Sequence, residues 1–204
     1  TIDGTVTQNQ TLTANVATID DADGTIGVNY TYQWLRDDDV ITGATNATYT
    51  LVQADVGRAI TVTSSYTDNE GTAESVTSTA TAAVIDVNDL PTGIIGIEGV
   101  STAGQTLTAI TDGLSDADGL GTLTYQWIRG TTVEGAVDVS IPGATNASYT
   151  LTQSDITKDI SVRVSYTDVA GNAETINSAA VYVASTQATG IFTEDSNQAL
   201  GGTA

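Results

Sequence analysis

Aspartate is the residue of this sequence whose type and spacing could do chemistry. Short acidic groups recur along the chain: Asp21-Ala22-Asp23, Asp86-Val87-Asn88-Asp89, Asp116-Ala117-Asp118, and the single residues Asp68 and Asp168. A calcium ion takes about six to eight oxygen ligands, so carboxylates and amides from several segments must converge on it. Asp, Asn and Gly also favour plain solvated turns. The acidic groups therefore allow two interpretations, a calcium site or solvent-exposed turns.

The charge balance favours a cation as partner. The 204 residues include 25 Asp+Glu, 5 Lys+Arg and no His, which gives a formal net charge of -20. Nucleic acids and anionic membrane surfaces bind basic patches, so neither is an expected partner. A hydrophobic content of 40% is too high for a disordered acidic tail. We expect a folded chain with an acidic surface.

Several function classes are excluded or disfavoured by residue content. The chain has no Cys and no His, so disulfides and catalysis by these residues are ruled out. Glu70 and Glu74 could form a glycosidase pair, but no cleft or positioned partner is predicted, and we expect no enzyme. No apolar run is long enough for a membrane helix, so membrane insertion is not expected. We expect a monomer that is a segment of a longer protein.

The chain contains one pattern twice. Both copies carry Tyr-Gln-Trp (32–34 and 125–127), Gly-Ala-Thr-Asn-Ala (43–47 and 143–147) and Ser-Tyr-Thr-Asp (65–68 and 165–168). Self-similarity of this kind indicates a repeat architecture. We predict a first repeat at 1–90, a second at 91–187, and a linker with the start of a third repeat at 188–204.

Thr, Ser, Val, Ile and Tyr dominate, and short alternating runs end at Gly, Asn and Asp. This pattern predicts an all-β chain built as two β-sandwiches. Expected strands include 4–7, 10–16, 29–36 and a long final strand of the first repeat at 74–85. Side chains alternate across a strand, so Tyr30, Tyr32 and Trp34 share one face. We expect that face to be the core.

Each repeat resembles the immunoglobulin-like sandwich. The resemblance lies in a Trp on the third strand (Trp34, Trp127), a turn before a late strand, and a Tyr that ends that strand (Tyr66, Tyr166). Two features depart from the family pattern. The inter-sheet cysteines are absent, and the turn Asp55-Val56-Gly57 has no glycine in its second copy, 155–157. The likeness is therefore to cysteine-free bacterial repeats.

More narrowly, both repeats resemble those of giant calcium-dependent bacterial adhesins of the RTX type. The shared strings are Asp-Ala-Asp-Gly, Tyr-Gln-Trp, Gly-Ala-Thr, Tyr-Thr-Leu and Ser-Tyr-Thr-Asp. This resemblance implies a secreted segment at the bacterial surface, which projects a distal binding domain for cell adhesion or biofilm formation. Its partners would be calcium ions and the neighbouring repeats of the same chain.

The segment 86–91 resembles the calcium-binding linker of cadherins, in which alternate Asp and Asn residues bridge consecutive domains. This resemblance implies a calcium site made by Asp86, Asn88, Asp89, Asp116, Asp118 and Asp168. The first repeat also offers the turn 53–55 at the end nearest this linker. Asp21, Asp23 and Asp68 are the equivalent loop residues and would form half of another site, its other half lying before Thr1. No Asp occurs at 184–190, so a looser link is expected there.

The alternative function is a module that binds a carbohydrate or a protein partner directly. Exposed aromatic side chains outside the core would favour it. The sequence offers few candidates, since most Trp and Tyr residues occupy predicted inward positions and Phe192 is the only Phe. Core packing is the favoured role of the paired Trp and Tyr residues.

Overall fold

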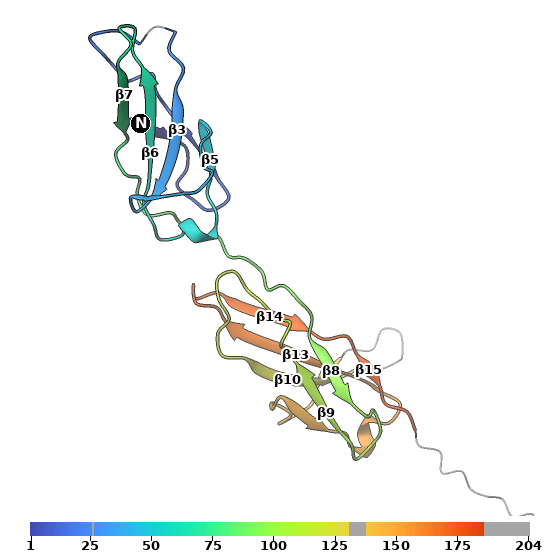
Figure 1. Cartoon of the computed structure of the whole chain (residues 1–204). Coiled ribbons are helices and arrows are strands. Elements are labelled where there is room, and N and C mark those ends of the chain that lie inside the picture. The colour runs from blue at the N-terminus through green and yellow to red at the C-terminus, as the bar shows by residue number, and fades with distance from the viewer. Residues whose placement is uncertain (26, 131–137, 186–204) are drawn as a thin grey trace, which may run out of the picture. The chain divides into compact units, whose positions relative to one another are not determined.

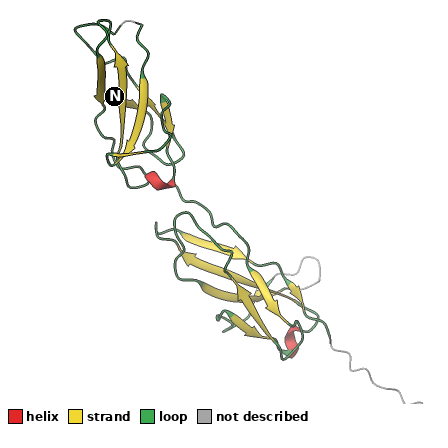
Figure 2. Cartoon of the chain, in the orientation of Figure 1, coloured by secondary structure: helices red, strands yellow, loops and turns green. Residues whose placement is uncertain are grey.

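The computed structural model describes residues 1–25, 27–130 and 138–185, and within them the chain is all-β (Figure 1). The described residues form antiparallel sheets and two 3-10 turns, with no α-helix (Figure 2). The elements of the first repeat are β1 (Ile2–Asp3), β2 (Thr11–Ala14), β3 (Thr31–Arg36), β4 (Asp39–Val40), β5 (Thr48–Thr50), η1 (Gln53–Asp55), β6 (Ile60–Thr67) and β7 (Ala73–Thr77). Those of the second are β8 (Gly96–Gly99), β9 (Thr106–Ile110), β10 (Thr124–Arg129), β11 (Val139–Ser140), β12 (Ser148–Thr150), η2 (Gln153–Asp155), β13 (Asp159–Thr167), β14 (Ala173–Asn177) and β15 (Val181–Tyr182).

The two repeats have the same sheet topology. In the first, one sheet has the order β1-β2-β5 and the other the order β4-β3-β6-β7. In the second, the orders are β8-β9-β12 and β11-β10-β13-β14, and β15 adds to β13. Trp34 lies opposite Val62 in the first repeat, as Trp127 lies opposite Val162 in the second. Two antiparallel sheets in each repeat are consistent with a β-sandwich.

One buried cluster joins the two sheets of the first repeat. It draws Leu12 from β2, Trp34 from β3 and Ile60 and Val62 from β6. The Trp34 ring is completely buried, stacks on Tyr49 at a centroid distance of 5.7 Å, and donates its indole N–H to Asn46 O. The prediction that the Trp face of β3 points inward is confirmed.

A buried carboxylate fixes the 3-10 turn of each repeat to the core. Asp55 is 0% exposed; its Oδ2 accepts the backbone N–H of Val52 at 2.8 Å and the Tyr49 hydroxyl at 2.9 Å. Its Oδ1 pairs with the guanidinium of Arg36 at 2.6 Å. The second copy makes the same set of contacts at residue 155. A buried carboxylate with this many donors holds the turn rigidly.

The second repeat keeps this turn without its glycine. Gly57 has φ +74° and donates its N–H to Val84 O. Thr157 takes φ +62° and donates to Val183 O in the same way. The turn geometry is therefore retained. Thr157 is β-branched, so its left-handed backbone conformation is strained in a way that glycine would avoid.

Two strand boundaries differ from the sequence prediction. The first strand is Ile2–Asp3 rather than 4–7, and β7 ends at Thr77 rather than near residue 85. Beyond β7, hydroxyl groups accept the N–H groups of β6: Ser78 Oγ accepts that of Val62 and Thr81 Oγ1 that of Ile60. The backbone N–H groups of Ser78 and Thr81 still donate to the carbonyls of Val62 and Ile60. Hydroxyl groups that accept strand N–H groups end a regular ladder.

The described chain divides into two compact units. Unit 1 contains Thr1–Thr92, Ser115–Thr122 and Tyr166–Glu174, and unit 2 contains the remainder. The acidic loops of both repeats and the segment 86–89 thus belong to unit 1. The third repeat expected at 188–204 lies outside the described residues. No helix in the described ranges has the length and hydropathy needed to span a membrane.

Candidate metal centre

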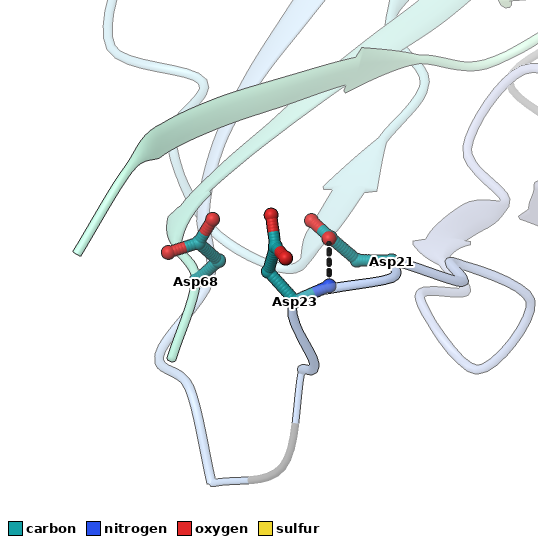
Figure 3. A group of neighbouring side chains, drawn as sticks. All are labelled: Asp21, Asp23 and Asp68. Carbon is teal, nitrogen blue, oxygen red and sulfur yellow. Dashed lines mark hydrogen bonds between the residues drawn. The ribbon is translucent and has the colours of Figure 1, made fainter. Parts of the chain in front are cut away.

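Three carboxylates of the first repeat converge. Asp21 and Asp23 come from the loop between β2 and β3, and Asp68 follows β6 (Figure 3). One oxygen from each lies within 4.8 Å of the others. Among the described residues, this is the one group of three acidic side chains that meets this spacing. The cluster could hold a metal ion, and the sequence predicted its three members.

Hydrogen bonds position two members of this cluster. Asp21 Oδ2 accepts the Tyr66 hydroxyl at 2.8 Å, and Asp21 Oδ1 accepts the backbone N–H of Asp23 at 2.9 Å. Asp68 Oδ1 accepts the N–H of Thr72 at 2.7 Å. The bond to Asp21, followed by desolvation, raises the pKa of Tyr66 to about 12, so the phenol remains a donor at neutral pH. The neighbours orient these carboxylates and leave other oxygen lone pairs for a cation.

The second repeat builds the same local frame. Asp116 Oδ2 accepts the Tyr166 hydroxyl at 2.5 Å, and Asp116 Oδ1 accepts the N–H of Asp118 at 2.9 Å. Asp168 Oδ1 accepts the N–H of Asn172 at 2.7 Å. Desolvation and then the bond to Asp116 raise the pKa of Tyr166. The acidic loop and the end of β13 are thus held together in both copies.

A close backbone approach keeps the second acidic loop in place. A Cβ at Gly121 would overlap the carbonyl oxygen of Thr167, the last residue of β13. Only glycine allows the loop to lie this near the strand. The approach brings Asp116 and Asp118 to the side of β13 from which Asp168 follows.

The two loops differ in what else they contact. Asp118 accepts one donor on each carboxylate oxygen: Gln53 Nε2 on Oδ1 at 2.8 Å and the backbone N–H of Asp89 on Oδ2 at 2.6 Å. Asp89 Oδ2 in turn accepts Gln8 Nε2 at 2.8 Å. Inside unit 1, the segment 86–89 therefore contacts the second acidic loop directly.

Asp86 has a carboxylate oxygen whose hydrogen-bonding capacity is unsatisfied. Its Oδ1 is buried and has no hydrogen-bond partner among the described residues. Burial is the largest cause that raises the pKa of the Asp86 carboxyl, and the charges of Asp118, Asp168 and Asp89 raise it further. A hydrogen bond from the backbone N–H of Val87 acts in the opposite direction and lowers this pKa. A buried carboxylate oxygen beside like charges is unfavourable unless a proton or a cation compensates it.

The predicted linker residues are therefore placed unequally. Asp89 donates its backbone N–H to Asp118, and Asp116 and Asp168 are held by their own hydrogen bonds. The charges of Asp118, Asp168 and Asp89 act on Asp86, but no three of these carboxylates meet within the 4.8 Å found in the first repeat. Asn88 is exposed and donates its amide to Glu174 Oε1 at 2.8 Å. We name the set Asp86, Asp89, Asp116, Asp118 and Asp168 the linker cluster.

Three polar residues of this region were not among the predicted ligands. Glu174 is buried at 5% exposure, and Gln8 and Gln53 contact Asp89 and Asp118. Glu174 follows the second Ser-Tyr-Thr-Asp string as Glu74 follows the first, which is a signal that the sequence contained. Gln8 is neutral, so a search for acidic groups passes over it, whereas the turn 53–55 was placed near the linker without Gln53 being named as a ligand.

The basic residues do not neutralise the linker cluster. Within the described ranges, the arginine ion pairs involve Asp55, Asp37 and Asp155, none of which is a predicted ligand. Carboxylate and amide oxygens without a basic partner suit a hard divalent cation such as Ca²⁺ or Mg²⁺. Among the described residues, the spacing of three carboxylates that a metal ion needs is met by Asp21, Asp23 and Asp68.

Comparisons with known proteins add no family assignment. The sequence matches no protein-family model, and no curated protein is significantly similar to it.

Proposed function

We propose that this chain is a calcium-stiffened extender segment of a large bacterial surface adhesin, made of two tandem immunoglobulin-like sandwiches. In this proposal the segment is secreted and projects a distal binding domain for adhesion or biofilm formation. The observation that supports a role for calcium is the state of Asp86. Its buried Oδ1 has no hydrogen-bond donor among the described residues, and the charges of other aspartates act on it.

The proposed role of calcium follows from charge. The linker cluster contains carboxylates from three chain segments, 86–89, 116–118 and 168, and the charges of Asp118, Asp168 and Asp89 act on Asp86. Two like charges about 4 Å apart repel by on the order of 1 kcal/mol in water, and by more when partly desolvated. A divalent cation replaces this repulsion with attraction to every segment at once. Binding therefore restricts the motion of 86–89 relative to the acidic loop.

The repeat cores support a folded state that does not require the ion. Trp34 is completely buried in a cluster that contains no predicted ligand, and Trp127 is completely buried as well. Removal of calcium should consequently loosen the linker cluster and leave the sheets folded. A spacer with these properties is stiff in calcium-rich medium and flexible without it.

Small-angle scattering with calcium and with a chelator tests this function. We expect the radius of gyration to change and the scattering to become that of a flexible chain on chelation, while circular dichroism keeps its strand signal. The Asp116→Ala/Asp118→Ala variant should behave as the chelated protein in both conditions. Asp38→Ala/Asp39→Ala removes the same charge at an exposed turn and is the matched control.

Identical scattering curves for the wild type with calcium and with chelator would reject the stiffening role of calcium. The chain would then be a spacer that does not respond to calcium. Native mass spectrometry during a calcium titration gives the stoichiometry independently. If calcium binds without a change in scattering, the ion has a role other than stiffening.

A further inference from the structure

A cleft opens beside β6 and β7 in the first repeat (Figure 1). Its volume is about 390 Å³. Val62 and Ser64 of β6 and Val76 of β7 line one side, and Thr1 lines the other together with the loop after β2. Val76 is 45% exposed. The cleft therefore leaves part of the first core open to an apolar side chain.

The second repeat has a chain segment at the corresponding place. Ile2 of β1 lies opposite Ala14, and Ile97 of β8 lies opposite Ala109 in the same way. β1 and β8 are therefore equivalent, and the residues just before β8 correspond to positions before Thr1. The second repeat thus shows what the cleft of the first can accommodate.

The segment before β8 is held by backbone pairing and by a buried side chain. Thr92 donates its N–H to Ser115 O at 2.7 Å and accepts the N–H of Ser115 at 3.0 Å. A Cβ at Gly93 would overlap the carbonyl oxygen of Gly113, so this position requires glycine. Ile95 ends the segment and is only 4% exposed.

The first repeat offers the same partners without the segment. Asp20 corresponds to Ser115, and no hydrogen-bond partner of its backbone N–H or C=O is found in the part of the chain that the structure describes. Ile19 is half-buried, whereas its counterpart Leu114 is buried. An extended segment could pair with Asp20 through its backbone and bury an apolar side chain beside Ile19 and Val76.

The sequence contains a second copy of this segment. Thr189-Gly190-Ile191-Phe192 repeats Thr92-Gly93-Ile94-Ile95, with the glycine in second place and an apolar residue in fourth. Within the 204 residues, no further Tyr-Gln-Trp or Ser-Tyr-Thr-Asp string follows it. The sequence therefore supplies one more such segment than it supplies partners for it downstream.

We propose that residues 189–192 of one copy of this chain dock as a strand in the cleft of the first repeat of a second copy. Thr189 then pairs with the backbone of Asp20, Gly190 permits the close approach, and Phe192 enters the cleft. Each copy has one cleft and one such segment, so the contact is head-to-tail and can continue from copy to copy. The cleft contains no residue of the linker cluster, so this inference is independent of the proposed function. The monomer expected from the sequence then holds only at low concentration.

Sedimentation velocity over a range of protein concentrations tests the docking. Chelator excludes calcium bridges between copies, and about 1 M salt reduces the Debye length to about 3 Å, which screens the repulsion between acidic copies. We expect the wild type to associate. Gly190→Val and Phe192→Ser should each lower the association constant about tenfold. Leu200→Ser removes an apolar side chain elsewhere in the same stretch and is the matched control.

Disulfide formation tests the register, because the chain has no cysteine of its own. Residues that exchange both hydrogen bonds in an antiparallel pair have Cα atoms about 5.5 Å apart, which a disulfide can span. A mixture of the single variants Asp20→Cys and Thr189→Cys should therefore give a dimer with a 20–189 disulfide. Peptide mass spectrometry identifies the bond. Ser196→Cys in place of Thr189→Cys is the control and should give a much lower yield.

A wild type that stays monomeric at every concentration would overturn the proposal. Association that persists in folded Gly190→Val and Phe192→Ser, or that Leu200→Ser weakens equally, would do the same. If circular dichroism shows that a variant is unfolded, the cysteine mixtures decide: equal yields with Thr189→Cys and Ser196→Cys would refute the docking. In the double variant Asp20→Cys/Thr189→Cys, a disulfide within one chain would exclude the second copy as the occupant.

Discussion

The two repeats use the same acidic loop in different surroundings. In both, a tyrosine from the late strand donates to the first aspartate, and the third residue of the loop donates its N–H to the same side chain. In the first repeat the carboxylates then gather within 4.8 Å. In the second, Asp118 has both oxygens occupied by donors from Gln53 and Asp89. The motif determines the loop, and other segments determine what its carboxylates contact.

The largest expected effect tests whether the cores are equivalent beneath these different loops. Trp34→Ala and Trp127→Ala should each lower the free energy of unfolding of their own repeat by about 3–5 kcal/mol, because both rings are fully buried. Each variant leaves one Trp, which reports on the other repeat during urea denaturation. Circular dichroism reports on both repeats. A shift in the midpoint seen by the remaining Trp would show that the two cores unfold together.

A smaller effect is expected where the tyrosines support the loops. Tyr166→Phe should lower the free energy of unfolding by about 2 kcal/mol, because it leaves Oδ2 of the buried Asp116 carboxylate without a donor, while Oδ1 keeps the N–H of Asp118. Tyr66→Phe should lower the free energy of unfolding by a smaller amount, because Asp21 is only half-buried and a water molecule can replace the phenol as its donor. Urea denaturation gives both values, and Tyr182→Phe, at an exposed ring, is the control. Equal losses at Tyr66 and Tyr166 would contradict the difference in burial between the loops.

The smallest effects should have opposite signs in the two loops. In calcium-free buffer, Asp23→Asn removes a like charge from the first cluster and should stabilise the protein by up to about 1 kcal/mol. Asp118→Asn should destabilise it by about 1 kcal/mol, because an amide oxygen can replace only one of the two accepting oxygens. Thermal unfolding in chelator measures both changes. Changes of the same sign would mean that the loops do not differ without the ion.

The sequence predicted what depends on local pattern. Alternation placed Trp34 in the core, and the Asp-x-Asp spacing identified Asp21 and Asp23, which meet Asp68 in the structure. These features follow from strand geometry and from turn residues.

Other features depend on contacts between distant segments. Asp55 was assigned to a turn but is completely buried, because Arg36 and Tyr49 compensate its charge. The sequence prediction placed the turn 53–55 at the end of the first repeat nearest the linker, but it did not pair Gln53 with Asp118, which lies 65 residues away in the sequence. The sequence prediction also missed the end of β7. Serine occurs within predicted strands of this chain, so Ser78 gives no signal that its hydroxyl group accepts the N–H of Val62.

The pairing of arginines with aspartates inside each repeat has a consequence for encounters between molecules. Arg36 and Arg129 are tied to buried aspartates, and Arg58 is paired with Asp37, so the surface presents an excess of negative charge. Two copies approaching in solution should repel each other, and this repulsion is screened beyond a Debye length of about 8 Å at physiological salt. Neighbouring molecules would then keep apart at low ionic strength and approach more closely at high ionic strength. Ionic strength would thus regulate crowding, separately from any ion that binds in the linker cluster.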